Sequence, residues 1–299
     1  MQCTSTVLMI RPASFKYNEQ TAANNFFQQK DQPPSIQEQA VKEHDAMAEL
    51  LRSNGVEVIV IVDTHSPVKP DALFPNNWFA CSDKHITLFP MHAPNRRMER
   101  RQDIIDVIQH KTGTKMIHDL SAYEENSQFL EGTGSMVCDH VYKIVYACLS
   151  ARTNEQLVKE YAVLIGYTYR IFIAADENGR EIYHTNVMMC IGEKFAVLCA
   201  DAITHSSEKQ DIIQSMENTG HEVILISLQQ MSCFAGNMLQ VLNKDGEPLL
   251  VMSRTAALSL SGSQFTILKK YAKPLIADVS AIEKAGGGSV RCMLAEIFI

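Results

Sequence analysis

One unit recurs four times along this chain at a nearly constant spacing, and this recurrence restricts the possible folds more than any other feature of the sequence. Each unit contains small polar residues, a short apolar strand, a turn, a second strand, a helix and a further strand. The units begin near residues 77, 132, 186 and 237, in steps of 55, 54 and 51 residues. Internal repeats of this length indicate a fold built from copies of one supersecondary unit.

The two ends of the chain supply material for a fifth unit. A strand at Val7 and a strand at Cys292 would complete it, so we predict an α/β fold of five ββαβ modules closed into a ring. We expect a single domain over residues 1–299. Neighbouring modules would then direct their strand starts toward one central site. The alternative is an ordinary α/β sheet in which the spacing is a coincidence.

Composition argues against several classes of protein. The chain is 46% hydrophobic and 20% charged, which is enough to bury a core, and its net charge of −7 without a long basic run argues against nucleic-acid or anionic-membrane partners. No apolar run reaches the roughly 20 residues of a membrane span, and the N-terminus lacks the basic start of a signal peptide. The eight cysteines form no C-x-x-C pair, which favours free thiols and a soluble cytoplasmic protein.

Hydrophobic periodicity alternates between strand and helix along the whole chain. It predicts helices at 35–53, 97–109, 154–164, 206–218 and 255–271. Short β-branched runs between them predict strands, among them 141–148 and 187–190.

Three residues at predicted strand starts could together carry covalent chemistry. Cys292 follows the glycine-rich bend Gly286-Gly287-Gly288, where the backbone can approach a ligand closely, and a thiol there is a candidate nucleophile if a base lies nearby. His184 and Glu131 each open another repeat. In the ring, the three would converge as nucleophile, acid–base and orienting group. Singly, each is more often a packing or structural residue.

Two competing kinds of site have weaker support. His184 and Cys190 are six residues apart and Cys81 and His85 are four apart, and neither spacing resembles a paired zinc-ligand motif. The glycines at 286–288 lack the Lys-Ser/Thr pair of a phosphate-binding loop. We therefore expect neither a metal nor a cofactor.

Several short motifs stand in a fixed order along the chain: 96–99 (RRME), 131–134 (EGTG), 150–153 (SART), 184–186 (HTN), 286–288 (GGG) and 291–293 (RCM). Together they resemble the motifs of the guanidine-modifying superfamily of arginine deiminases, amidinotransferases and related hydrolases. The resemblance spans nearly the whole chain and implies a five-fold pseudosymmetric α/β propeller, the pentein fold. It also implies that Cys292 is the nucleophile, His184 the general acid–base and Glu131 the buried carboxylate.

The chain differs from arginine deiminases at the positions of the two aspartates that bind the guanidinium group. Asn77 and Asn186 stand at these positions, so two charge-assisted pairs, each worth roughly 1.5–3 kcal/mol, would be lost with a cation. A neutral ureido group carries both donors and an acceptor, and amides suit it. The Arg11-Pro12 start and the segment 74–78 (FPNNW) resemble the citrulline utilization hydrolase group, which implies hydrolysis of citrulline to ornithine, carbon dioxide and ammonia.

The expected mechanism is covalent. The Cys292 thiolate would attack the ureido carbon, and His184 would protonate the leaving amine and then activate water. Because a neutral substrate brings no cation, a Cys292–His184 ion pair would have to do more of the work of ionising the thiol. Glu131 would hold either His184 or a ureido nitrogen.

The other end of the substrate carries the charged carboxylate and ammonium groups of an amino acid, and we expect charged side chains to bind it. Arg152, and Arg96 or Arg97, are candidates for its carboxylate, and we also count Asp71 among the substrate-binding residues. Two other functions stay open: an arginine or methylarginine deiminase or amidinotransferase-like enzyme, and a non-catalytic binding protein. A homo-oligomer is possible in either case.

Overall fold

The computed structural model describes residues 1–82 and 85–299, and it is an α/β fold with five three-stranded sheets of one common order. In each sheet the first strand runs antiparallel to the middle strand, and the third runs parallel to it. The sheets are β15 (Ala295–Glu296), β1 (Thr6–Arg11), β2 (Glu57–Val62); β3 (Phe79–Cys81), β4 (His85–Leu88), β5 (Met116–Asp119); β6 (Val137–Asp139), β7 (Ile144–Cys148), β8 (Thr168–Phe172); β9 (Met189–Ile191), β10 (Phe195–Leu198), β11 (Glu222–Leu225); and β12 (Leu239–Leu242), β13 (Pro248–Ser253), β14 (Lys273–Ala277).

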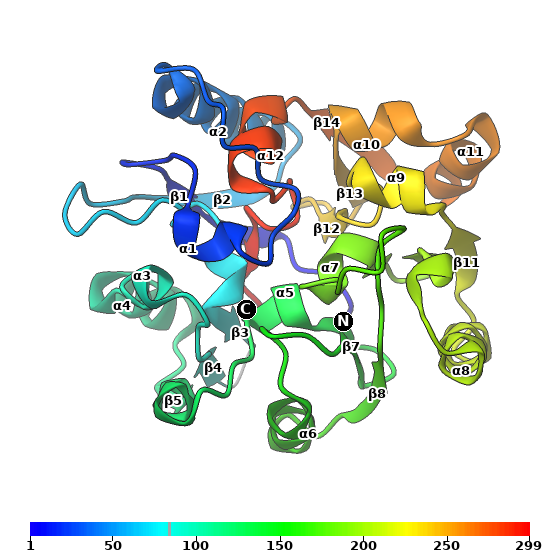
Figure 1. Cartoon of the computed structure of the whole chain (residues 1–299). Coiled ribbons are helices and arrows are strands. Elements are labelled where there is room, and N and C mark those ends of the chain that lie inside the picture. Colours follow the sequence, from blue (N-terminus) through cyan, green and yellow to red (C-terminus); the bar gives the residue numbers. More distant parts are fainter. Residues whose placement is uncertain (83–84) are drawn as a thin grey trace.

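A helix links the middle strand to the third strand of every module and lies on the outside of the molecule (Figure 1). These crossover helices are α2 (Ile36–Ser53), α4 (Gln102–Thr112), α6 (Glu155–Leu164), α8 (Ser206–Asn218) and α11 (Gly262–Tyr271). The shorter helices are α1 (Glu19–Ala22), α3 (Pro94–Arg97), α5 (Gly132–Ser135), α7 (Thr185–Met188), α9 (Leu228–Ser232), α10 (Arg254–Ser259) and α12 (Ser280–Gly286), with the 3-10 turns η1 (Pro75–Asn77), η2 (Ser121–Asn126) and η3 (Ala200–Ala202).

The structure divides two of the predicted helices. The segment 97–109 begins in α3 and continues in α4 after a break at Arg101, whose backbone is extended. The segment 255–271 is divided into α10 and α11, because Ser261 and Gln264 form a capping box that starts a new helix. Apolar periodicity continues across both breaks, so the pattern alone did not reveal them.

Two predicted strands start later in the structure. The segment 187–190 begins inside the helical turn α7 and becomes strand only at Met189, and the segment 141–148 becomes strand at Ile144. Equivalent single turns, η1 and α5, precede β3 and β6. The first strands of three modules are therefore preceded by a single helical turn.

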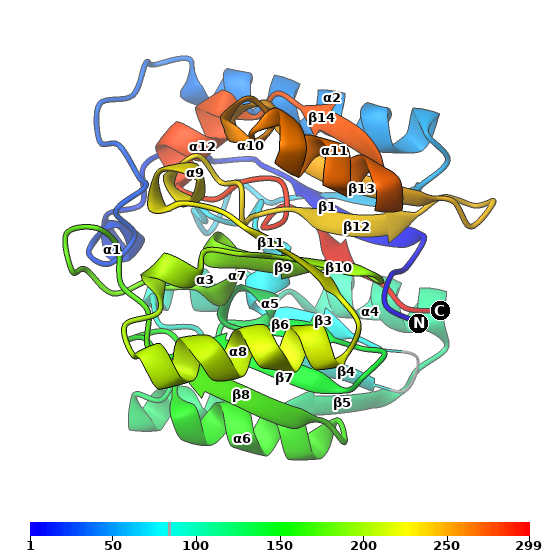
Figure 2. The same ribbon diagram turned by 90° about the vertical axis from the view of Figure 1, so that its right-hand side faces the viewer.

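The chain closes on itself through the sheet that contains both of its ends. β15 pairs with β1, with Leu8 opposite Ala295. The two termini lie close together, at the end of the molecule away from α1 and α9 (Figure 2).

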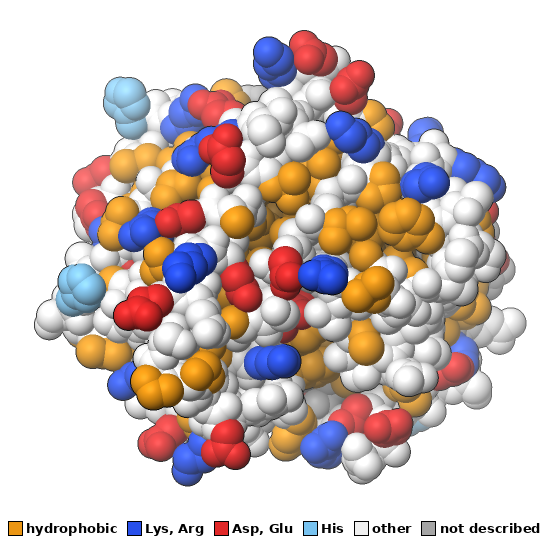
Figure 3. Space-filling view, turned by 90° about the horizontal axis from the view of Figure 1, so that it is seen from above, with side chains coloured by type: hydrophobic (Ala, Val, Ile, Leu, Met, Phe, Trp, Pro, Cys, Tyr) orange, Lys and Arg blue, Asp and Glu red, His pale blue; other side chains and the backbone are white. Residues whose placement is uncertain are grey.

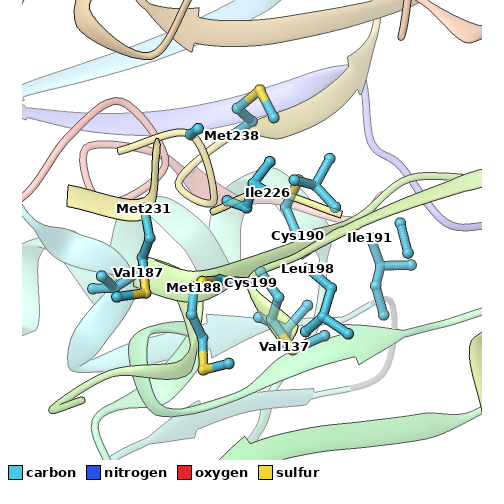
Figure 4. Packing of buried hydrophobic residues seen from close by; sticks show 14 of the residues in the cluster. Val137, Val187, Met188, Cys190, Ile191, Leu198, Cys199, Ile226, Met231 and Met238 are labelled. Carbon is cyan, nitrogen blue, oxygen red and sulfur yellow. The ribbon is translucent and has the colours of Figure 1, made fainter. Parts of the chain in front are cut away.

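The largest group of buried apolar residues lies around β9 and β10 (Figure 4). Both strands are buried at every position, as expected for apolar runs covered on two faces. Cys190 and Cys199 lie in this cluster as small apolar side chains, and all eight cysteines are free thiols.

Charged side chains of both signs are interspersed on the face seen in Figure 3. Among the described residues, no helix has both the length and the apolar composition needed to cross a membrane.

Candidate active site

The turns that precede the first strands meet in the middle of the molecule. α5 packs against both η1 and α7, and the chain that follows α12 reaches the same region near the centre of Figure 1. Each module contributes one small residue, two or three positions before its first strand: Asn77, Gly134, Asn186, Asn237 and Cys292.

Gly134 keeps the centre of this region open. A β-carbon at this position would overlap Asn77 Nδ2 and would lie 2.8 Å from His184 Nδ1. Only glycine therefore allows these two side chains to approach each other across the module boundary.

Cys292 lies in a buried turn after α12. That helix ends at Gly286 and is capped by Gly287, whose φ of +64° favours glycine, and the Cys292 N–H donates to Ser289 O at 3.0 Å. The thiol is 5% exposed. Its sulfur lies 3.4 Å from Asn237 Nδ2 and 3.7 Å from Asn186 Nδ2. Two amide groups, from two different modules, thus contact the candidate nucleophile.

His184 and Glu131 form a buried pair. His184 Nε2 lies 2.8 Å from Glu131 Oε2, and the other carboxylate oxygen accepts from the His92 N–H at 3.0 Å. Arg152 Nη1 lies 3.5 Å from Glu131 Oε2. Of the two tasks considered for Glu131, the structure therefore favours holding the histidine.

Electrostatics keep Glu131 charged and His184 neutral at pH 7. Burial by itself would raise the pKa of Glu131, but the nearby Arg152 and the His184 hydrogen bond outweigh it and hold this pKa well below its usual range. Burial lowers the pKa of His184 to about 4, against the opposing effect of Glu131. A neutral His184 that donates from Nε2 to the carboxylate leaves Nδ1 as its basic nitrogen.

Arg96 fixes the orientation of the Asn77 amide. Arg96 Nη1 donates to Asn77 Oδ1 at 2.7 Å, while its other N–H groups reach the Glu99 carboxylate twice at 2.9 Å and Phe74 O at 3.1 Å. Since arginine can only donate, the Asn77 oxygen must face Arg96. The Asn77 Nδ2 group is consequently directed elsewhere, and within residues 1–82 and 85–299 this buried group has no hydrogen-bond partner.

Arg152 is held by the segment that contains α1. Its Nε donates to Asn24 Oδ1 at 2.9 Å, its Nη2 reaches the same oxygen, and its Nη2 also donates to Thr21 O at 2.8 Å. The guanidinium lies over the Tyr183 ring, 4.9 Å from its centroid. Asn24 Oδ1 thus accepts from the two N–H groups, Nε and Nη2, with which an arginine ordinarily binds both oxygens of a carboxylate.

Asp71 is a buried carboxylate with one oxygen unused. Its Oδ2 accepts from Asn18 at 2.8 Å and from Thr21 at 3.0 Å, whereas Oδ1 has no partner in the part of the chain that the structure describes. Arg96 Nε lies 4.0 Å from Asp71 Oδ2. Burial raises the pKa of Asp71, although Arg96 opposes the shift.

These groups line a small cavity of about 20 Å³. This is room for about one water molecule. An amino acid can enter only if part of the lining moves. The cavity is lined by Asn25, Asp71, Phe74, Asn77, Arg96, Arg152, Tyr183, His184, Gly286, Gly287, Gly288 and Cys292.

The structure brings the expected site residues into one region. Six of them line the cavity, and two contact its lining: Glu131 through His184, and Asn186 through Cys292. Arg97, the alternative to Arg96, instead donates from Nε to Met91 O at 3.0 Å and lies 3.4 Å from Glu124 Oε2. The sequence analysis missed Asn237, although the repeat places it at a strand start. It also missed Glu99, the carboxylate that holds Arg96. Among the described residues, no group of three or more His, Cys, Asp or Glu side chains could hold a metal ion.

Comparison of sequences decides the family. Residues 11–299 match the family described as N,N-dimethylarginine dimethylhydrolase, eukaryotic. The chain belongs to this family. The dimethylarginine dimethylhydrolase family is part of the guanidine-modifying, or pentein, superfamily, and its members are hydrolases that act on carbon–nitrogen bonds. No curated protein matches the chain.

Solved structures share the fold of this dimethylarginine dimethylhydrolase family member. The substrate-bound N-terminal domain of ArgZ, a cyanobacterial arginine dihydrolase, has a TM-score of 0.75 at 15% identity, with 98% of each chain covered. The chain spans only 40% of the longer ArgZ chain. The citrulline complex of a dimethylarginine dimethylhydrolase mutant from Pseudomonas aeruginosa has a TM-score of 0.70 at 15% identity, covering 99% of this chain and 100% of that one.

Proposed function

We propose that the chain hydrolyses citrulline to ornithine, carbon dioxide and ammonia through a covalent intermediate on Cys292. The observation that carries the choice of substrate is a pair of amide atoms, Asn77 Nδ2 and Asn186 Oδ1, that have no hydrogen-bond partner among the described residues. One is a donor and the other an acceptor. A ureido group offers a carbonyl oxygen to the first and N–H groups to the second. A guanidinium has only donors and would leave Asn77 Nδ2 without a partner, which is costly in a buried site.

Arg152 and Asp71 would hold the amino-acid end of the substrate. A substrate carboxylate would replace Asn24 in the fork of Arg152, with two oxygens in place of one. The unused Asp71 Oδ1 would accept from the α-ammonium, whose charge would favour the ionised carboxylate. Arg96 is already bonded to Glu99, Asn77 and Phe74, so we assign it to holding Asn77 rather than to the substrate carboxylate.

The reaction would proceed in two displacements. Cys292 adds to the ureido carbon, and its proton passes to His184 Nδ1. His184 returns that proton to the ornithine nitrogen as the C–N bond breaks, which leaves a carbamoyl group on sulfur. His184 then takes a proton from water, the hydroxide displaces the thiolate, and the carbamic acid released decomposes to carbon dioxide and ammonia. Glu131 keeps His184 in the tautomer whose Nδ1 is basic.

The wider expectations for the chain also belong to this proposal. We infer that the five sheets form the closed pseudo-five-fold propeller of the superfamily and act as one catalytic domain. The common order of the sheets and the pairing of β15 with β1 support this inference.

Product analysis on a panel of substrates tests the proposal. Purified protein is incubated with citrulline, arginine, agmatine and dimethylarginine, and ornithine, citrulline and ammonia are quantified. We expect equal amounts of ornithine and ammonia from citrulline. Citrulline formed from arginine or dimethylarginine would instead establish a deiminase or a dimethylarginine hydrolase. No product from any substrate would favour a binding protein.

A further inference from the structure

We propose that Asn237 is a catalytic residue, which stabilises the Cys292 thiolate by donating a hydrogen bond to its sulfur. The proposal rests on the proposed function, since it assigns a task to a neighbour of the nucleophile.

The Asn237 amide has only one possible orientation. Its Oδ1 accepts from the Arg291 N–H at 3.1 Å, and its Nδ2 donates to Asn186 O at 2.8 Å. A backbone N–H can only donate and a backbone carbonyl can only accept, so the oxygen and nitrogen cannot be exchanged. Asn237 is 1% exposed, and its second N–H is left for Cys292 Sγ at 3.4 Å. The thiol form can also donate to Asn237 Oδ1 at 3.7 Å.

Most of the charged and titratable side chains around Cys292 are paired with other side chains. His184 and Arg152 face Glu131, and Arg96 is bonded to Glu99. The Arg291 guanidinium, next to Cys292 in the chain, donates to Glu296 at 2.9 Å. The remaining titratable groups that line the cavity are Asp71 and Tyr183. Within the described part of the chain, the donors in hydrogen-bond contact with the sulfur are therefore the amides of Asn186 and Asn237.

Asn237 is better placed for this task than Asn186. The Asn186 Nδ2 group is 3.7 Å from the sulfur, and no described residue bonds the Asn186 Oδ1 atom and so fixes the amide. Asn237 is fixed by bonds to two backbone groups from separate segments. A donor held rigidly before the charge forms stabilises that charge without reorganisation. With a neutral substrate, such a donor replaces part of the help that a guanidinium would bring to thiolate formation.

The pH dependence of Cys292 alkylation tests the proposal directly. Iodoacetamide labelling of the Cys292 peptide is followed by mass spectrometry in the wild type, Asn237→Ala and Asn237→Asp. We expect the pH midpoint of labelling to rise by about one pH unit in Asn237→Ala, because a charge-assisted bond to the thiolate is lost. The labelling rate at the high-pH plateau should stay within about threefold of wild type, since the thiolate itself is intact.

Two further variants separate the proposed role from a structural one. Asn243 lies at the other end of β12, is similarly buried and also bonds backbone N–H groups, so Asn243→Ala should leave the midpoint unchanged. Asn237→Asp keeps the acceptor for the Arg291 N–H but loses the donor, and it should raise the midpoint even if Asn237→Ala fails to fold. An unchanged midpoint in Asn237→Asp, or a lower plateau at an unchanged midpoint, would overturn the proposal.

Labelling needs no turnover, so the two proposals can fail separately. If the wild type forms no ornithine from citrulline, the proposed function is wrong, but the pH midpoint of labelling still tests the role of Asn237. An active wild type whose Asn237 variants keep the wild-type midpoint would overturn only the role of Asn237.

Discussion

Arg96 Nη1 donates a 2.7 Å hydrogen bond to Asn77 Oδ1, and this contact decides which end of the Asn77 amide faces the cavity. The donor end is left for the ligand. Our choice of a ureido over a guanidino substrate follows from this orientation.

Replacing both asparagines by aspartate should move the substrate preference away from citrulline. In the double variant Asn77→Asp, Asn186→Asp, two carboxylates would be buried beside a neutral group without a cation to pair with them. We expect kcat/KM for citrulline to fall at least tenfold, about 1.4 kcal/mol in transition-state stabilisation, while any gain on arginine depends on preserved geometry. Kinetics of both proteins on both substrates check this. An unchanged citrulline-to-arginine ratio would show that these residues do not select the substrate.

Cys292→Ser should abolish turnover and spare the fold. A hydroxyl is far less acidic than a thiol, so the nucleophile is lost. The matched control is Cys233→Ser, at a partly exposed free cysteine outside the cavity, which should keep full activity. Activity of Cys292→Ser within tenfold of wild type would remove Cys292 from the mechanism.

His184→Ala should lower kcat by a factor on the order of 10² or more, because proton transfer to the leaving amine and from water is lost. His205→Ala serves as the control, since the His205 side chain is 57% exposed. Unchanged rates in His184→Ala would move the acid–base role to another residue.

The stability of the fold should fall as the pH drops below about 6.5. Burial lowers the pKa of His184 to about 4, so the unfolded chain binds a proton between pH 6.5 and 4 that the folded chain does not. Stability therefore rises with pH across this window. When the pH is lowered from 7 to 5, the free energy of unfolding of the wild type should fall by about 2 kcal/mol more than that of His184→Gln, as measured by urea unfolding. Equal losses in both proteins would contradict a neutral buried His184.

Gly134→Ala should impair turnover far more than folding. The added methyl would overlap Asn77 Nδ2 and crowd His184, so we expect kcat/KM to fall at least tenfold. Gly262→Ala is the control, since a β-carbon there meets open space. Full activity in Gly134→Ala would show that the open centre between modules is not needed.

The sequence predicted the fold better than it predicted the geometry of the site. The repeat indicated five modules because apolar periodicity and turn residues act over short distances along the chain. The convergence of Cys292, His184 and Glu131 was expected from the same repeat and from family resemblance. Amide orientation was not predictable, because Asn77 is fixed by Arg96 and Asn237 by Arg291, contacts that only the folded chain creates. The expected Cys292–His184 ion pair stays a prediction. Burial lowers the pKa of His184 and favours its neutral form, so the pair would form only when His184 takes the proton of Cys292.

Trapping the intermediate tests the central claim most directly. Wild-type protein is mixed with citrulline that carries ¹³C at the ureido carbon, and the reaction is quenched in acid during turnover. The protein is then digested, and the mass of the Cys292 peptide is measured by mass spectrometry. We predict that the mass of the Cys292 peptide increases by one labelled carbamoyl group. The increase should be absent from protein incubated without substrate and from protein incubated with ornithine. Conversion of citrulline to ornithine with Cys292 unlabelled at every quench time, together with full activity of Cys292→Ser, would contradict covalent catalysis at this residue.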